Sequence, residues 1–266
     1  MEFETLRIEH APGTDPGDGI RVLVLNRPDV LNAMNTQMFH DMREAVHQLA
    51  FEEGLRVLIV RGEGERAFSA GGDLKERKGM SDDTWRRQHQ LAEEGLLAIK
   101  DFPQPVIAAV EGVAHGGGCE LALMCDFIIA SREATFAQPE VKRGIMPGGG
   151  GIQNLVRAAG MRRAKQLIFT GDRFSAEEAA RWGVVNELVE RGQALSAAIA
   201  VARRIVEAAP MSVRYAKLAA SRGGEVDFHT GYMFDLAAYN VLVPSHDRLE
   251  GVVAFNEKRK PRWTNR

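Results

Sequence analysis

The sequence has little of what marks a secreted, membrane-bound or nucleic-acid-binding protein. Its two cysteines, Cys119 and Cys125, match no metal-ligand spacing, so we expect them to be reduced and buried and expect no metal site. The N-terminus lacks the features of a signal or transit peptide, and no apolar run approaches the roughly 20 residues of a membrane helix. Lys and Arg number 34 against 36 Asp and Glu, a formal net charge of -2. We therefore expect a cytoplasmic protein without DNA or membrane partners that acts on a metabolite, unless the sequence is a trimmed mature form.

Apolar content is ample for a large core, at 45% of 266 residues, and its pattern alternates between strands and helices. Residues 20–25 and 57–60 are apolar runs, and between them lies a helical pattern that Asn35 can cap. This order predicts an α/β architecture with crossover connections. A long helix is expected from Ser81 to about Asp101. Further strands are predicted at residues 106–110, 127–130, 134–137 and 184–186.

From about residue 193 the pattern becomes wholly helical. We therefore divide the chain into a core at residues 1–192 and a helical region at residues 193–266, which we expect to be structural or oligomerising. No heptad series, low-complexity segment or internal repeat is visible.

A glycine turn at residues 116–118, with Glu120 just beyond it, is the first candidate site. Glycines leave backbone N–H groups uncovered, and a helix start adds orphan donors and partial positive charge. The turn is therefore a candidate for stabilising an oxyanion beside an acid or base, although an ordinary turn with a helix-start Glu is the commoner explanation of such a motif taken alone. Residues 70–73 form a second exposed-backbone turn, and Glu140 lies in a loop that could simply be solvated.

A dinucleotide-binding site is a further possibility, because residues 62–67 match the G-x-G-x-x-A fingerprint. That fingerprint requires a helix to open at its glycines, and here a second glycine break follows at Gly71 and Gly72. We therefore interpret the match as a surface turn.

Several motifs together resemble the crotonase (enoyl-CoA hydratase/isomerase) superfamily. They occur in the family's order and with similar spacing, at residues 67–76, 116–122, 138–140, 145–150 and 254–259. The resemblance covers nearly the whole chain. It implies a crotonase-like spiral of β-β-α repeats with a C-terminal helical region, assembled as a homotrimer or a dimer of trimers.

The resemblance also implies the chemistry of the site. The amides of Gly72 and Gly117 would form an oxyanion hole for the thioester carbonyl of an enoyl-CoA. Glu120 would activate water for attack on the β-carbon, and Glu140 would transfer the proton at the α-carbon. Two carboxylates favour a hydratase over an isomerase, which is the alternative within the family. Coenzyme A is part of the substrate, so no separate cofactor is expected.

Contacts with coenzyme A are implied at residues scattered along the chain, and one pair of them would come from a neighbouring subunit. The implied contacts are Arg27, Val30, Leu31, Ala70, Asp73, Leu74, Gly148 and, from the neighbour, Phe255 and Lys258. Lys258 could equally be a solvated lysine at a helix end.

Three segments point to a subfamily. Residues 73–77, 148–151 and 247–251 are similar to those of methylglutaconyl-CoA hydratases. Some proteins of that kind are linked to RNA binding, so an RNA-binding or scaffolding protein is the alternative of another class, although we do not expect an RNA partner. Gly72 stands where many hydratases have Ala, which leaves the acyl specificity open.

Overall fold

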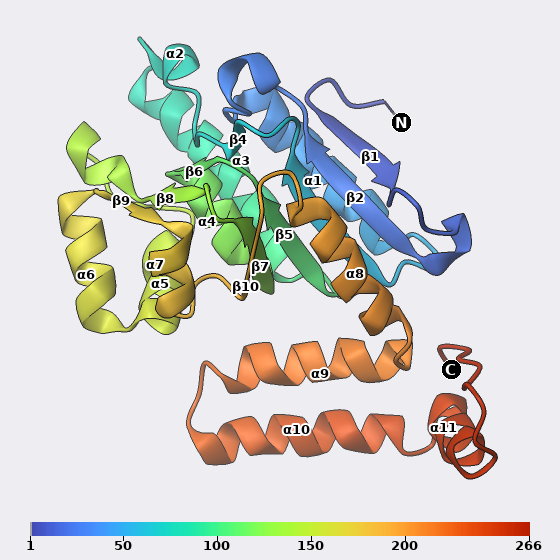
Figure 1. Ribbon diagram of the computed structural model, residues 1–266. Helices are drawn as coiled ribbons and strands as arrows, with labels where there is room; N and C mark the ends of the chain where they lie inside the picture. Colours follow the sequence, from blue (N-terminus) through green and yellow to red (C-terminus); the bar gives the residue numbers. More distant parts are fainter. Residues whose placement is uncertain (1) are drawn as a thin grey trace.

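The structure is a computed structural model that describes residues 2–266, and two sheets form its frame (Figure 1). The larger sheet has six strands and the smaller has four. In spatial order the larger sheet contains β1 (Leu6–His10), β2 (Ile20–Leu25), β3 (Val57–Gly62), β5 (Val106–Val110), β7 (Phe127–Ser131) and β10 (Glu187–Val189). The smaller contains β4 (Ala67–Ser69), β6 (Val113–His115), β8 (Thr135–Ala137) and β9 (Arg173–Ser175). Only β1 and β9 pair antiparallel with their neighbours in these sheets.

The chain advances as a spiral, because each turn supplies one strand to each sheet and then a helical segment. The three turns are β3–β4 with the helices α2 (Leu74–Arg77) and α3 (Asp82–Lys100), β5–β6 with α4 (Gly117–Met124), and β7–β8 with η3 (Pro139–Arg143), α5 (Gly151–Ala159) and α6 (Met161–Thr170). Strands that follow one another in this way pair in parallel. The predicted spiral of β-β-α repeats is confirmed.

The central strands of the large sheet, β2, β3, β5 and β7, are buried on both faces, which explains why they are almost continuously apolar. Alternate residues belong to two hydrophobic clusters: Leu23 and Leu25 pack in one, and Val22 and Val24 in the other. The first cluster includes α1 (Thr36–Ala50), α3 and α4. The second lies between the sheet and α8 (Ala194–Val206), whose Ala194, Ala198 and Ala202 permit a close approach.

The C-terminal helices α9 (Pro210–Gly223), α10 (Phe228–Leu242) and α11 (His246–Asn256) lie to one side of the two sheets (Figure 1). α9 and α10 pack closely where Gly223 meets Gly231, since a Cβ on Gly223 would stand 3.4 Å from the Cα of Gly231. Large apolar side chains on α10 and α11 are exposed in the single chain, among them Phe228, Tyr239 and Phe255. The division at residue 193 stays a prediction, since α8 itself packs on the sheet.

The last predicted strand was misplaced. It begins at Glu187 rather than at residue 184. The N–H groups of Val184 and Val185 donate to the carbonyl of Ala179, and both side chains are buried. Val184 and Val185 are therefore apolar because they pack in the core from the turn that follows α7 (Ala176–Arg181), and not because they belong to a strand.

Other details of the elements also depart from or extend the predictions. The elements β1, β6, β9 and α5, and the short helices η1 (Pro16–Asp18) and η2 (Pro28–Val30), had not been predicted.

Cys119 and Cys125 are free and buried, as expected. Among residues 2–266, no helix has the length and apolar character needed to cross a bilayer.

Candidate active site

A cleft of roughly 1250 Å³ opens beside the turns that follow β4 and β6. Its walls come from these two turns, from the start of α4, from α3 and from η3 with the segment that follows it. Eight of the predicted site residues line it: Leu31, Ala70, Gly72, Leu74, Gly117, Glu120, Glu140 and Gly148. The topology thus brings together residues that are far apart in the sequence.

The N–H groups of Gly72 and Gly117 are close to each other and unpaired. Met34 forms a parallel bridge by donating to the carbonyl of Gly71 at 2.8 Å and accepting from the N–H of Asp73 at 2.9 Å, so the N–H of Gly72 points the other way. Gly117 is the first residue of α4, where N–H groups have no partner within the helix. Neither N–H donates a hydrogen bond to any residue between 2 and 266. A Cβ built on Gly117 would stand 3.6 Å from the nitrogen of Gly72.

Glycine is required where these two turns meet. Gly71 has a φ of 92°, a conformation that residues with side chains rarely adopt, and a Cβ there would lie 2.7 Å from the carbonyl oxygen of His115. The same Cβ would lie 3.0 Å from the nitrogen of Gly117. A side chain at this position would push the two turns, and their free N–H groups, apart.

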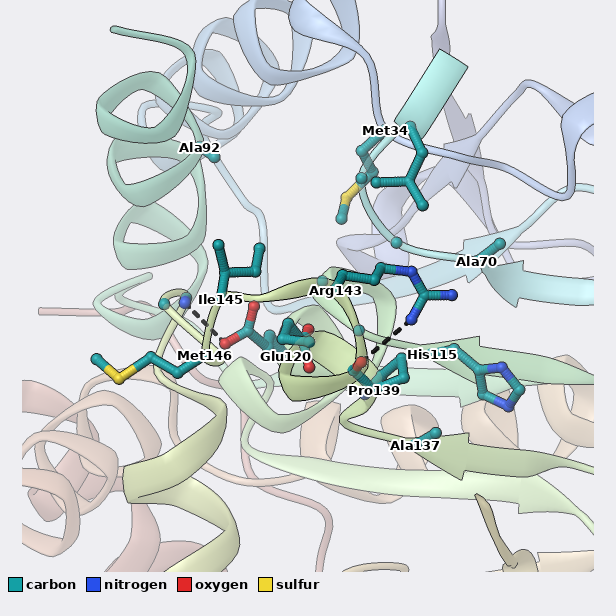
Figure 2. Close-up of a pocket in the computed structure, with 18 of the residues that line it drawn as sticks. Met34, Ala70, Ala92, His115, Glu120, Ala137, Pro139, Arg143, Ile145 and Met146 are labelled. Atoms are coloured by element: carbon teal, nitrogen blue, oxygen red, sulfur yellow. Dashed lines mark hydrogen bonds between the residues drawn. The ribbon is translucent and has the colours of Figure 1, made fainter. Parts of the chain in front are cut away.

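Glu120 is buried in the first turn of α4, with 6% of its surface exposed, and its side chain points into the cleft (Figure 2). One carboxylate oxygen, Oε1, accepts hydrogen bonds from the N–H groups of Gly149 at 2.7 Å and Gly151 at 3.0 Å. Burial raises the pKa of Glu120, while these two bonds act in the opposite direction. The other oxygen, Oε2, accepts no hydrogen bond from residues 2–266.

Glu140 approaches the same space from η3. Its Oε1 would lie 3.0 Å from a Cβ on Gly116, and its Oε2 is buried without a hydrogen-bond partner among residues 2–266. Burial raises the pKa of Glu140 to about 7, and the neighbouring charge of Glu120 adds to this. The site therefore holds one carboxyl whose pKa is raised towards neutrality and a second that is anchored by amides.

Three predicted coenzyme A contacts, Arg27, Val30 and Asp73, do not line the cleft. Arg27 and Asp73 form an ion pair at 2.9 Å, and Arg27 also donates to the carbonyl of Ala33 at 2.5 Å. The carboxylate of Asp73 caps α2 by accepting from the N–H of Lys75. In this structure the pair joins the loop after β2 to the turn that carries Gly72.

Of the remaining predicted contacts, Phe255 lies in the last turn of α11 and Lys258 in the turn just after the helix, and both are exposed. Neither lines the cleft of its own chain. Their assignment to the site of a neighbouring subunit stays a prediction, as do the roles of the other site residues.

Several cleft residues were missed by the sequence analysis. Arg77 on α2 and His89 on α3 face the cleft, and the ring of His89 packs against Gly148. His115 lies on the far side of Pro139 from Glu120 (Figure 2), and burial, together with nearby arginines, lowers its pKa to about 4. Arg77 belongs to the segment 73–77 noted for its family resemblance, but the sequence analysis assigned none of these three side chains to the site, since their orientation depends on how α2, α3 and β6 are packed. Within residues 2–266, no three His, Cys, Asp or Glu side chains are grouped to hold a metal ion.

Comparison with known proteins places this fold and cleft in a family. The family model described as Enoyl-CoA hydratase/isomerase matches residues 15–266. The chain is 40% identical over 241 residues to the short-chain-enoyl-CoA hydratase of Clostridium acetobutylicum, covering 91% of this chain and 92% of that protein. It is 38% identical over 264 residues to human mitochondrial methylglutaconyl-CoA hydratase, covering 98% of this chain and 77% of that protein.

Among solved structures, the enoyl-CoA hydratase of Bacillus anthracis superposes with a TM-score of 0.95 at 38% identity, covering 99% of this chain and all of that one. The protein therefore belongs to the enoyl-CoA hydratase/isomerase family, as its motifs predicted. Relatives with short-chain and methylglutaconyl names are almost equally similar, so overall identity does not select a subfamily.

Proposed function

We propose that the protein is an enoyl-CoA hydratase, which adds water reversibly across the α,β double bond of an enoyl-CoA thioester. The observation that carries this proposal is the presence of two carboxyls, the buried Glu120 and the partly buried Glu140, in the cleft that also holds two unpaired N–H groups. Hydration needs a base for water, an acid for the α-carbon and a place for negative charge. The cleft has a candidate for each.

The thioester carbonyl would lie between the N–H groups of Gly72 and Gly117. Attack at the β-carbon moves negative charge onto the carbonyl oxygen, and fixed donors stabilise that charge without reorganising. Loss of one such donor typically lowers the rate by about 10²–10³-fold. The ion pair between Arg27 and Asp73 would hold the Gly72 turn in position from behind.

Proton transfer would be divided between the two carboxyls according to their surroundings. Water adds its oxygen to the β-carbon and gives a proton to Oε2 of Glu120, the oxygen left free by Gly149 and Gly151. Glu140 gives a proton to the α-carbon, for which a pKa of about 7 is well suited near neutral pH. One proton is taken up and one released, so the sum is the addition of one water molecule, and exchange with solvent restores both groups.

We further propose that the chain acts as a homotrimer or a dimer of trimers. The exposed apolar side chains of α10 and α11 support this, because a patch of this kind on a stable protein marks an interaction surface. In such an assembly Phe255 and Lys258 would reach a neighbour's coenzyme A. The chemistry itself requires no metal or separate cofactor.

Crotonyl-CoA tests the activity directly, since hydration removes its conjugated double bond and lowers the ultraviolet absorbance. We expect turnover by the wild type and a loss of at least about 100-fold in kcat for both Glu120→Gln and Glu140→Gln. Glu133→Gln, at an exposed loop position, is the matched control and should retain wild-type activity. Full activity in both cleft variants would refute the mechanism. Double-bond migration in a 3-enoyl-CoA without uptake of labelled water would instead indicate an isomerase.

A further inference from the structure

The loop that holds Glu120 has few contacts of its own. Residues 148–151 are four consecutive glycines, which have no side chains to pack into the core and whose backbone is the most flexible. Gly149 and Gly151 donate to Oε1 of Glu120. Gly148 itself forms no hydrogen bond with any residue between 2 and 266. The position of the two donors therefore depends on the side chains that neighbouring elements place against the loop.

Two side chains of α3, His89 and Leu96, pack against the start of this loop. A Cβ built on Gly148 would stand 2.7 Å from Cε1 and 2.8 Å from Nε2 of His89, and the next atom, at 3.9 Å, belongs to the same ring. A Cβ on Gly149 would stand 2.5 Å from Cδ1 of Leu96. The two side chains are about two helical turns apart, so they lie on the same face of α3. This face of the helix therefore supports the first two glycines.

The ring of His89 is held by a second residue of α3. Its Nε2 lies 3.1 Å from Oε1 of Glu93, one helical turn further on. Both side chains line the cleft and are partly exposed, so the pair itself contributes little to stability. It does restrict rotation of the ring, which has Glu93 as a partner and packs on the backbone of Gly148. On the next residue, a Cβ of Gly149 would stand 2.8 Å from Oε2 of Glu120, so His89 and Glu120 contact successive residues of one loop.

We propose that His89 is a positioning residue for Glu120. Its ring holds Gly148 in place, and the N–H groups of Gly149 and Gly151 that follow then keep the carboxylate in its orientation. This rests on the proposed hydratase function and names a residue on which its base depends. A displacement of about 1 Å in a catalytic group can lower a rate by about 100-fold. A run of glycines cannot supply the rigidity that this requires, whereas a ring packed on its first residue can.

Hydrogen–deuterium exchange of the full chain tests the positioning without any substrate. His89→Ala should speed exchange at the N–H groups of Gly149 and Gly151, followed in a peptide spanning residues 145–152, by at least about 10-fold, because the loop opens more easily. His89→Phe keeps a ring at this position and should retain most of the protection. His40→Ala, at an exposed position on α1, is the matched control and should behave as the wild type. Equal exchange in His89→Ala and the wild type would overturn the proposal.

Hydration of crotonyl-CoA tests whether His89 acts through Glu120. His89→Ala should lower kcat by at least about 10-fold and change KM by less than about 2-fold. In a Glu120→Gln background, where the base is already absent, the same substitution should lower kcat by less than about 2-fold. Losses that multiply would mean that His89 acts on another part of the site, and would overturn the proposal. A wild type without activity would contradict the hydratase function instead, and the exchange experiment would still decide whether His89 holds the loop.

Gly148→Ala tests the same contact from the loop. Its Cβ would collide with the ring of His89 and displace the loop, so exchange should rise and kcat should fall as they do in His89→Ala. Combining the two substitutions removes the collision, since the three atoms nearest to that Cβ all belong to the ring. The double variant should therefore exceed Gly148→Ala in kcat by at least about 3-fold, and no recovery would refute the contact. If His89→Ala does not fold, unchanged exchange in Gly148→Ala would overturn the proposal.

Discussion

Replacing Glu140 by Gln should stabilise the protein in alkaline solution and leave its stability almost unchanged in acid. The carboxyl is partly buried in the cleft wall, and its Oε2 has no hydrogen-bond partner among residues 2–266. Burial raises its pKa from 4.5 to about 7, so folding favours the protonated form. Glutamine has the same shape and carries no charge at any pH, and therefore removes the cost of burying the carboxylate.

The sign and the magnitude follow from proton linkage. Below pH 4.5 the carboxyl is protonated in both the folded and the unfolded chain and contributes no difference. As the pH rises from 4.5 towards 7, the unfolded chain loses its proton first, so the folded state becomes less stable; above 7 the cost is complete. At about 1.4 kcal/mol for each pKa unit the cost is about 3.4 kcal/mol. Because the side chain is partly open to solvent, we expect somewhat less than half of this, or about 1.5 kcal/mol.

Urea denaturation at fixed protein concentration, at pH 5 and pH 8.5, measures the effect. The variant should gain about 1.5 kcal/mol of unfolding free energy over the wild type at pH 8.5 and much less at pH 5, while losing activity at both. Glu133→Gln, at an exposed loop position, should show no such difference. An equal gain at both pH values, or none at pH 8.5, would refute the assignment of a raised pKa to Glu140.

Three further substitutions test other parts of the structure. Gly117→Ala would place a Cβ 2.8 Å from Cε of Met34 and 3.6 Å from the nitrogen of Gly72, so kcat/KM for crotonyl-CoA should fall about 100-fold while the melting temperature changes little. Asp73→Ala removes a helix cap and a partly buried ion pair, and should lower the unfolding free energy by about 1–2 kcal/mol; an unchanged denaturation midpoint would contradict this. Phe255→Asp should dissociate the proposed trimer in sedimentation experiments, and an unaltered sedimentation coefficient would argue against that interface.

Elements with strong periodicity were predictable because local patterning agrees with their final packing. The apolar run of β2 and the capped pattern of α1 were placed correctly from sequence alone. The strand β6 was missed because it has only three residues, which lie between Gly112 and Gly116. They form a strand only because they pair with β4 and β8. The helix α5 begins directly after a glycine-rich loop, and its start is set by tertiary contacts rather than by a side-chain cap.

The parts of the site that consist of a short local motif were predictable. The two glycine turns, with their uncovered N–H groups, and Glu120 after one of them are visible in the sequence. The family resemblance then connected them with Glu140. Arg77 lies in the segment 73–77 that was noted for its family resemblance, but nothing in that segment assigned its side chain to the site. Its exposure to the cleft depends on Gln88 and Trp85, which belong to another helix, so only the packed structure shows which way it points.

The loop that contains Gly149 and Gly151, and that holds Glu120, should determine the stereochemistry of the product. Because Gly149 and Gly151 both bind Oε1, the carboxylate cannot exchange its two oxygens without breaking two hydrogen bonds. A water molecule activated by Oε2 is therefore presented to the β-carbon from one fixed direction, against a double bond held in place by its own carbonyl. When that carbon becomes a stereocentre, a single enantiomer of the 3-hydroxyacyl thioester should form. In this way two backbone amides that hold the carboxylate of Glu120 would determine the handedness of the product.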